Sequence, residues 1–279
     1  MRRKRAFTLV ELLVVIAIIA ILMAILLPIL MRAKRQAQKV VCQANLRTIG
    51  AGLMMYVEDH KYYPGGWINT GPPGAAYLQG GPVAVWPTLI RKYLGSRKPF
   101  YCPARDAKFM WTDPPSEPRV LPKPSQQVAF GYGATEYVIY STMDGQPRYS
   151  VPWSYAYNFC GAGGIRNPVD LHVQRGLGWL VEDSGLPLVK ATMVKKPGEM
   201  IAIADSSGEF GNIAMAAAEW RAFMPEASGR GPGNIHQGGA NVLFCDGHVE
   251  WYLQKDLIVA DWQNGREPIR RFWNNDNEP

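Results

Sequence analysis

The chain contains a run of twenty residues without a formally charged side chain, residues 12–31. As an α-helix with a rise of 1.5 Å per residue, this run is about 30 Å long, the thickness of the hydrocarbon core of a membrane. Glu11 directly precedes the run. A carboxylate in a membrane-spanning helix costs about 2.5–3.5 kcal/mol at mid-membrane on insertion scales. A segment that served only as an anchor would be more stable without it, so Glu11 indicates a second task in the membrane.

The net charge of +7 is concentrated around this run. Residues 1–47 hold nine of the 30 Lys and Arg but only one of the 23 Asp and Glu, which leaves 21 basic and 22 acidic residues in the rest of the chain. The distribution speaks against a nucleic-acid partner, which the basic total alone would suggest. The basic N-terminus favours a single-pass protein with a cytoplasmic N-terminus and the C-terminal domain outside, although residues 32–35, which are also basic, act against this orientation.

A cleaved secretory signal peptide is the alternative interpretation of an apolar N-terminal run. The run is longer than the apolar part of such a peptide, Glu11 stands at its beginning, and no convincing small-x-small cleavage site follows it. We therefore favour a segment that remains in the mature protein.

Residues 6–18 closely resemble the N-terminal signature of type IV pilins and type II secretion pseudopilins. In that family, a prepilin peptidase cuts before the Phe and methylates its new amino group. The resemblance implies that residues 1–6 are a leader, that Phe7 becomes the N-terminus, and that Glu11 is the glutamate at the fifth place after the cut. The sequence departs from the family at Ala6, where Gly is usual. Alanine is the next smallest residue, so cleavage is still expected.

In the mature protein, the Phe7 ammonium and the Glu11 carboxylate would be the only charges in the span, and in a medium of low dielectric they need partners. The resemblance favours a contact between Glu11 and the Phe7 amine of a neighbouring subunit, which would set the axial register of a filament. The alternatives are that Glu11 reaches the membrane interface or pairs with the amine of its own chain. Pro28 matches the helix-bending proline of many family members and removes one backbone hydrogen bond.

The apolar pattern continues beyond the span and predicts one helix over residues 7–61, about 80 Å long. The residues of this stripe are Val40, Val41, Ala44, Ile49, Leu53 and Val57. Residues 7–31 would lie in the membrane and residues 32–63 outside it, packed on a soluble domain. Gly50 and Gly52 weaken the helix locally, and the sequence Tyr63-Pro64-Gly65-Gly66 ends it.

Residues 64–279 form one soluble domain with many Pro and Gly. A short helix is expected at residues 86–94, and six strands are expected at residues 127–132, 137–141, 154–159, 200–205, 240–245 and 248–253. Strands that follow a helical block predict an α+β fold with an antiparallel sheet, the pilin-like arrangement of a long helix on a sheet.

The C-terminal part contains His236 followed nine residues later by Asp246-Gly247. Together with residues 42–50 and several shorter blocks, this spacing resembles a large pseudopilin-like family (DUF1559-like) that is abundant in planctomycete-type bacteria and carries an H-x9-DG domain. Asp246-Gly247 fits a two-residue type I′ hairpin turn, in which both residues have positive φ. His236 would orient the loop that enters this hairpin by bonding backbone carbonyls. The motif is therefore expected to be mainly structural.

No cofactor is expected, and calcium is the one ion that the resemblance leaves open. Asp205, Asp246 and His248 are weak candidate ligands, but they form no EF-hand pattern. His236 with either Asp205 or Asp246 could form a catalytic pair only in principle, because nucleophile-elbow, HExxH, P-loop and dinucleotide signatures are absent from the sequence. The chain is therefore not expected to be an enzyme.

Four cysteines would lie outside the cytoplasm in the favoured orientation: Cys42, Cys102, Cys160 and Cys245. An oxidising compartment permits two disulfides in three connectivities. We prefer Cys42–Cys102, which would fasten the helix to the first loop, and Cys160–Cys245, and buried free thiols are the alternative. No pair has CxxC spacing, which speaks against zinc or redox chemistry.

Two functions are open at this point. The favoured one is a pseudopilin, a structural subunit of a type II secretion-like or type IV pilus-like filament in the inner membrane, with the prepilin peptidase and other pseudopilin subunits as partners. The other is a membrane-tethered module that binds carbohydrate or another extracytoplasmic ligand. The soluble part of more than 210 residues favours the second function, because it is large for a plain filament subunit.

Overall fold

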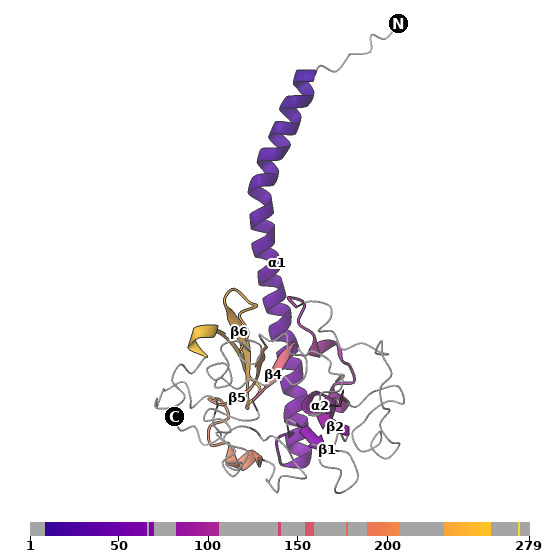
Figure 1. The fold of residues 1–279 in the computed structure, drawn as a ribbon. Helices are drawn as coiled ribbons and strands as arrows, with labels where there is room; N and C mark the ends of the chain where they lie inside the picture. Colours follow the sequence, from indigo (N-terminus) through magenta and orange to yellow (C-terminus); the bar gives the residue numbers. More distant parts are fainter. Residues whose placement is uncertain are drawn as a thin grey trace.

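The computed structural model is described here for residues 9–65, 67–69, 82–105, 139–140, 154–158, 177, 189–206, 232–257 and 273. Ala6, Phe7, Cys160 and the strand expected at residues 127–132 lie outside these ranges. One long helix, α1 (Leu9–His60), enters the soluble domain with its C-terminal half, and its N-terminal half projects from it (Figure 1).

The end of α1 is set by backbone geometry at Lys61. This residue has φ of 64°, a left-handed conformation that caps helices. Its N–H still donates to the carbonyl of Val57 at 2.7 Å, and the next residues leave the helix axis. Tyr63 then donates its N–H to Val189 at 2.9 Å, which binds the chain to another segment of the domain. The helix therefore ends close to the predicted residue 61, before Pro64.

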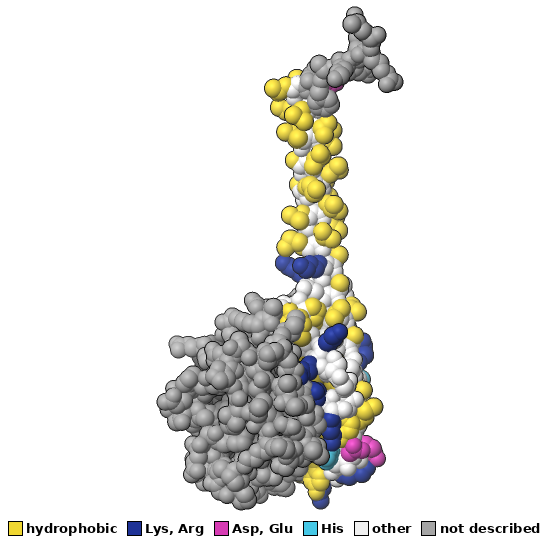
Figure 2. All heavy atoms as spheres, turned by 90° about the vertical axis from the view of Figure 1, so that its right-hand side faces the viewer, with side chains coloured by type: hydrophobic (Ala, Val, Ile, Leu, Met, Phe, Trp, Pro, Cys, Tyr) yellow, Lys and Arg dark blue, Asp and Glu magenta, His cyan; other side chains and the backbone are white. Residues whose placement is uncertain are grey.

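The two halves of α1 have opposite environments. The Leu, Val, Ile and Met side chains of residues 9–31 are between 46% and 78% exposed. Figure 2 shows them as a continuous apolar column that ends at a group of Lys and Arg side chains, where the basic residues 32–35 follow in the sequence. The projecting half is gently curved in Figure 1 and contains Pro28.

The buried face of the C-terminal half differs from the predicted stripe. Val40 and Val41 are 50% and 47% exposed, and Ala44 is exposed. The buried residues instead follow a regular spacing of three and four positions: Cys42, Leu46, Ile49, Leu53, Tyr56 and Val57. The predicted stripe was therefore wrong at Val40, Val41 and Ala44. The helix face that packs on the domain begins at Cys42, whereas the stripe was placed on the two apolar valines beside it.

The core of the domain is an antiparallel sheet with strand order β4 (Tyr155–Tyr157), β5 (Ile201–Asp205), β6 (Gly239–Phe244) and β7 (Val249–Leu253). Every residue of β4, β5 and β6 is buried, because both faces of these strands are covered. β7 is partly exposed. α1 packs against β6 and β7 (Figure 1).

A second, smaller sheet is also antiparallel, with the order β1 (Trp67–Asn69), β2 (Pro82–Val85) and β3 (Ile139–Tyr140). β2 leads directly into α2 (Trp86–Leu94), which packs on α1. Trp86 stacks on Tyr157 of β4 with ring centroids 5.5 Å apart, and Tyr157 donates its hydroxyl to the Pro64 carbonyl at 2.8 Å. Three short 3-10 helices complete the described elements: Lys98–Phe100, Ala191–Met193 and Gln254–Asp256.

The predicted α+β fold is confirmed, with one long N-terminal helix on an antiparallel sheet. The expected short helix coincides with α2, and five of the expected strands coincide with β3 to β7 to within three residues at either end. β1 and β2 were missed, because they are short and lie in a region dominated by Pro and Gly.

Gly50 and Gly52 allow the domain to approach α1 closely. A Cβ atom on Gly50 would lie 2.7 Å from Cδ1 of Leu243, a fully buried residue of β6. A Cβ atom on Gly52 would lie 2.7 Å from Cδ2 of Leu94 in α2. The low helix propensity of glycine is therefore offset by close packing on both sides.

We expect Gly50→Val to lower the free energy of unfolding of the detergent-solubilised protein by about 2 kcal/mol, because the added atoms overpack a buried contact. Ala51→Val is the matched control, since Ala51 is exposed on the same turn. Thermal unfolding followed by circular dichroism measures both. Equal stability of the two variants would contradict the packing role of Gly50.

Candidate functional site

The first candidate site is the N-terminal end of α1. Glu11 lies in the first turn of the helix and is exposed, surrounded along the chain by exposed apolar residues. Phe7 lies outside the described residues, so the predicted contact between its amine and Glu11 remains a prediction. The helix is long and apolar enough to cross a membrane, and the most apolar stretch of it is not buried at all by the rest of the chain.

The second candidate site is the place where α1 enters the domain, and its centre is a disulfide. Cys42 and Cys102 are bonded, with their Cα atoms 5.3 Å apart and a sequence separation of 60. Both cysteines are fully buried. This is the first of the two pairs that the sequence analysis preferred, and it joins the buried face of the helix to the segment after the 3-10 helix Lys98–Phe100.

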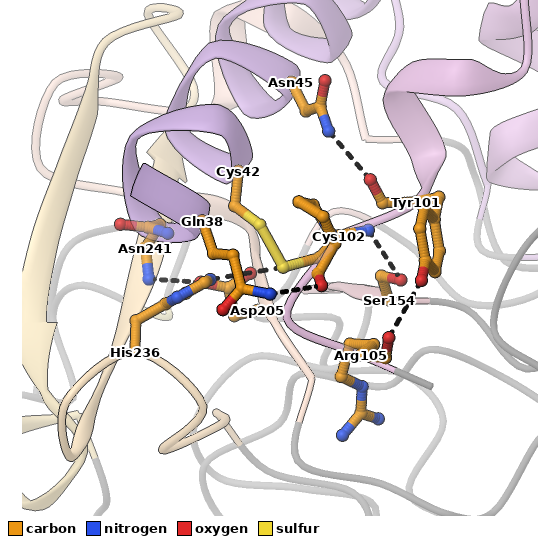
Figure 3. The surroundings of a disulfide bond; sticks show 11 residues. Gln38, Cys42, Asn45, Tyr101, Cys102, Arg105, Ser154, Asp205, His236 and Asn241 are labelled. Atoms are coloured by element: carbon orange, nitrogen blue, oxygen red, sulfur yellow. Dashed lines mark hydrogen bonds and ion pairs between the residues drawn. A yellow bond between two sulfur atoms is a disulfide. The ribbon is translucent and has the colours of Figure 1, made fainter. Parts of the chain in front are cut away.

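Two polar side chains flank this disulfide on the same face of α1. Gln38 donates its amide to the Pro103 carbonyl, and Asn45 donates its amide to the Tyr101 carbonyl, each at 2.8 Å. Figure 3 shows both amides pointing toward the segment that carries Cys102. Positions 38, 42 and 45 are spaced by four and three residues, so they line one face of a helix. Gln38 and Asn45 were not among the residues predicted from the sequence, although their spacing around Cys42 places them on the same helix face.

The second expected disulfide, Cys160–Cys245, is wrong: Cys245 is a free, buried thiol. It lies at the end of β6, where its own N–H donates to the Met200 carbonyl at 2.8 Å and its carbonyl accepts from the Tyr63 hydroxyl at 3.4 Å. Burial raises the pKa of the Cys245 thiol far above its usual range, so the thiol remains protonated.

His236 lies beside the disulfide and is only 2% exposed. Its Nε2 atom is 3.3 Å from Sγ of Cys102 and 3.5 Å from Oδ2 of Asp205 (Figure 3). The backbone of His236 pairs with Gly239, and its carbonyl accepts from the indole N–H of Trp251 at 3.0 Å. The loop into the hairpin is therefore held by the backbone of His236, whereas the ring reaches a sulfur and a carboxylate rather than the predicted carbonyls.

Asp205 is the last residue of β5 and is fully buried. Its Oδ2 atom accepts the backbone N–H of Asn241 at 2.6 Å, and its Oδ1 atom has no hydrogen-bond partner within the described part of the chain. Burial raises the pKa of Asp205 to about 7, and burial, with a smaller effect of Lys39, lowers the pKa of His236 to about 4. The two side chains therefore do not form an ordinary charged pair at neutral pH.

One donor atom from each of Cys42, Cys102, Asp205 and His236 lies within 4.8 Å of the others, and all four residues are buried. The four come from α1, the segment after Phe100, β5, and the loop before β6. Each is far from the others in the sequence, and this explains why spacing alone did not indicate the cluster.

The third candidate site is the tip of the β6–β7 hairpin. Phe244 and His248 are paired by a backbone hydrogen bond of 2.9 Å, and Gly247 donates its N–H to the Phe244 carbonyl at 3.0 Å. Of the two turn residues, Gly247 alone has positive φ, 94°. The connection is therefore a three-residue loop with a left-handed glycine in third place, and the predicted type I′ turn is wrong.

Asp246 and His248 meet at this tip, with Oδ1 and Nδ1 2.6 Å apart, and both are partly exposed. Asp205 lies elsewhere, because β5 runs away from the tip after Ile201, which pairs with Phe244. Four residues along a strand span about 13 Å. The structure therefore separates Asp205 from the other two weak metal candidates, and the calcium site that needs all three is not supported.

Comparison with known protein families identifies two regions of the chain. Residues 1–27 match the family described as a prokaryotic N-terminal methylation motif, and residues 31–100 match the family described as a protein of unknown function, DUF1559. The resemblance seen in the sequence is thereby confirmed, and the N-terminal part of the chain is that of a pilin-like precursor. No curated protein and no solved structure matches the chain. The His236–Gly247 block lies beyond the matched residues.

We expect Gly247→Ala to lower the free energy of unfolding by about 1–2 kcal/mol, the cost of a left-handed conformation for a residue with a Cβ atom. The added Cβ would be 3.7 Å from Cγ of Met54, an ordinary contact, so the cost is conformational and not steric. Gly247→Asn is the control, since asparagine tolerates this conformation better. Chemical unfolding measures the difference, and a variant with Ala as stable as the one with Asn would contradict the assigned turn.

Proposed function

We propose that this protein is a pseudopilin, a structural subunit that assembles through its N-terminal helix into a type II secretion-like or type IV pilus-like filament. The observation that carries this proposal is the combination of a prepilin-type N-terminus with a helix whose first half is exposed and apolar while its second half belongs to the core of a folded domain. One continuous helix thus connects a membrane segment with a soluble domain.

The exposed half of α1 needs an apolar environment in place of water. Its large apolar side chains form a column far more extensive than the apolar patches of soluble monomeric proteins. A membrane supplies this environment for the single chain, and the same helices of neighbouring subunits would supply it in a filament. The apolar helix and the prepilin motif support membrane anchoring, and we propose the inner membrane with the leader in the cytoplasm and the domain in the periplasm.

The domain is fastened to α1 so that the two move as one body. A buried apolar face, a disulfide and two side-chain hydrogen bonds hold the C-terminal half of the helix. A displacement of the helix along its axis would therefore be transmitted to the domain without a hinge between Gln38 and Lys61. A subunit that is added to or withdrawn from a filament requires this coupling.

In this proposal, the prepilin peptidase removes residues 1–6 and methylates the amine of Phe7. Glu11 then contacts the Phe7 amine of a neighbouring subunit, which compensates both charges in a medium of low dielectric. Pro28 lies near the C-terminal end of the exposed half, where its missing N–H removes one hydrogen bond of the helix. The role is structural, so we assign no catalytic residue. Within the described residues, no observation favours the alternative role as a ligand-binding module.

Mass spectrometry of the protein purified from membranes tests the processing. We expect a chain that begins at Phe7 and carries one methyl group on its amine. An Ala6→Gly variant is the matched control, since it restores the usual residue before the cut and should be processed at least as completely. A chain that keeps Met1, or that is cut near Ala33, would be incompatible with processing by a prepilin peptidase.

We expect Glu11→Ala to leave the protein in the membrane fraction but to reduce its assembly, because the amine of the neighbouring subunit loses its partner. Co-purification of two differently tagged copies from solubilised membranes measures assembly. Glu58→Ala is the matched control: Glu58 lies on the same helix, and its ion pair with Lys61 is on the surface and of little energetic value. Normal assembly of the Glu11→Ala protein would remove the role given to this carboxylate.

A further inference from the structure

We propose that the reduced form of the protein binds one Zn²⁺ ion through Cys42, Cys102, Asp205 and His236. The same two cysteines would then join α1 to the domain in either of two ways, by a disulfide or through a metal ion. This inference is independent of the proposed filament role, because it concerns only the buried centre of the domain.

The donor atoms are close enough to surround one ion. They lie within 4.8 Å of one another. In a tetrahedral site with Zn–S bonds of about 2.3 Å, two sulfur atoms are about 3.8 Å apart. Reduction of the Cys42–Cys102 disulfide releases the two sulfur atoms, which can then take up this separation.

The carboxylate of Asp205 is held by a hydrogen bond, as is common for carboxylates that bind metal ions. Its Oδ2 atom is fixed by the backbone N–H of Asn241, while its Oδ1 atom is fully buried and has no partner in the described part of the chain. A buried oxygen without a partner costs about 1–3 kcal/mol. The oxygen that faces His236 is Oδ2, at 3.5 Å from Nε2, so the carboxylate lies beside the other donor atoms of the cluster. Carboxylates that bind metals are commonly held in this way by a neighbouring donor.

The ring of His236 is turned toward the same point. Its Nε2 atom is the one that approaches both Cys102 and Asp205, so this nitrogen would bind the ion. The neutral imidazole is the form that binds metals. Trp251 holds the backbone carbonyl of His236, and the exchange of hydrogen bonds with Gly239 fixes the loop.

The donor set favours zinc over calcium. Two thiolates and one imidazole are soft or intermediate ligands, whereas calcium takes six to eight oxygen ligands. Four protein ligands in a buried site leave no open position, so the ion would be structural rather than catalytic. Two thiolates, one carboxylate and Zn²⁺ sum to a charge of −1, and the positive charges of Lys39 and Arg105 act on the residues of the site.

The two forms are related by thiol–disulfide exchange. The two zinc-bound thiolates transfer two electrons to a small-molecule disulfide, whose two sulfur atoms each take up one proton and leave as thiols. Cys42 and Cys102 form their own disulfide, and Zn²⁺ is released. The reverse reaction requires a dithiol reductant, which becomes a disulfide. The zinc form would tie β5 and the loop before β6 to α1, whereas the disulfide ties only the segment that carries Cys102.

Cobalt titration of the full-length protein in detergent tests the site. The protein is reduced, stripped of metals with a chelator, and titrated with Co²⁺ under anaerobic conditions. We expect one equivalent of Co²⁺ to give the visible bands of tetrahedral cobalt and the near-ultraviolet charge-transfer band of a thiolate ligand, and one equivalent of Zn²⁺ to abolish both. The oxidised protein is the internal control and should give neither band.

His236→Gln and Asp205→Asn should each weaken binding of Zn²⁺ by about 100-fold or more, because loss of an outer partner of a ligand already costs 10–100-fold. The matched controls are His248→Gln and Asp246→Asn, which alter the same residue types outside the cluster and should bind as the unaltered protein does. Near-ultraviolet circular dichroism of the oxidised form establishes that each variant is folded.

If a variant fails to fold, the Co²⁺ titration of the unaltered protein still tests the proposal. A reduced protein that binds no stoichiometric Co²⁺, or that binds it with the weak spectrum of six oxygen ligands, would falsify the assignment. Unchanged affinity in folded His236→Gln and Asp205→Asn proteins would show that the thiols bind without these residues, which equally overturns the four-ligand site. An increase of the melting temperature of the reduced protein on addition of Zn²⁺ is the supporting result.

Discussion

The attachment of the C-terminal half of α1 to the soluble domain is the constraint on which the rest of the structure depends. Most of the stability of a helix in a protein comes from the packing of its apolar face, and α1 has 52 residues. The domain covers the face from Cys42 to Val57 and thereby fixes where the exposed half begins. The glycines at positions 50 and 52 bring β6 and α2 against the helix backbone, and the Cys42–Cys102 bond closes the upper end of this contact. The exposed apolar half of α1 thus continues the same helix whose second half packs in the domain core.

The region around Cys42 combines covalent and polar contacts within about two turns of the helix. The amides of Gln38 and Asn45 satisfy two carbonyls of the segment that carries Cys102, and the disulfide lies between them. Beneath it, His236 and Asp205 bring groups that burial keeps from their usual ionisation. Buried polar groups are retained where they are bonded or where they bind something. Oδ1 of Asp205 and the side-chain amide of Asn241 have no hydrogen-bond partner within the described residues, and the four donor atoms within 4.8 Å of one another are the reason to consider an ion.

The His236–Gly247 block has two parts with different physical roles. The glycine at its end allows a three-residue loop, because a residue in third place must adopt positive φ. The histidine at its beginning lies far from that loop along β6 and reaches the disulfide cluster instead. The nine residues between His236 and Asp246 therefore cover one turn, the strand β6 and the first residue of the hairpin loop. The two ends of the motif do not act on each other.

The sequence by itself determined the apolar segment of membrane length, the single long helix, α2 and five strands. Each of these follows from local pattern: an uncharged run of membrane length, helical spacing, a Pro-Gly stop and alternating apolar residues. The Cys42–Cys102 pair was one preference among three connectivities, and the tertiary structure shows it. The tertiary structure alone decided which helix face is buried, that Cys245 remains a thiol, and that Asp205 lies with His236 instead of Asp246 and His248. These features depend on which distant segments of the chain pack together. Helix period and hydropathy can be read from the spacing of neighbouring residues, whereas burial and strand register cannot.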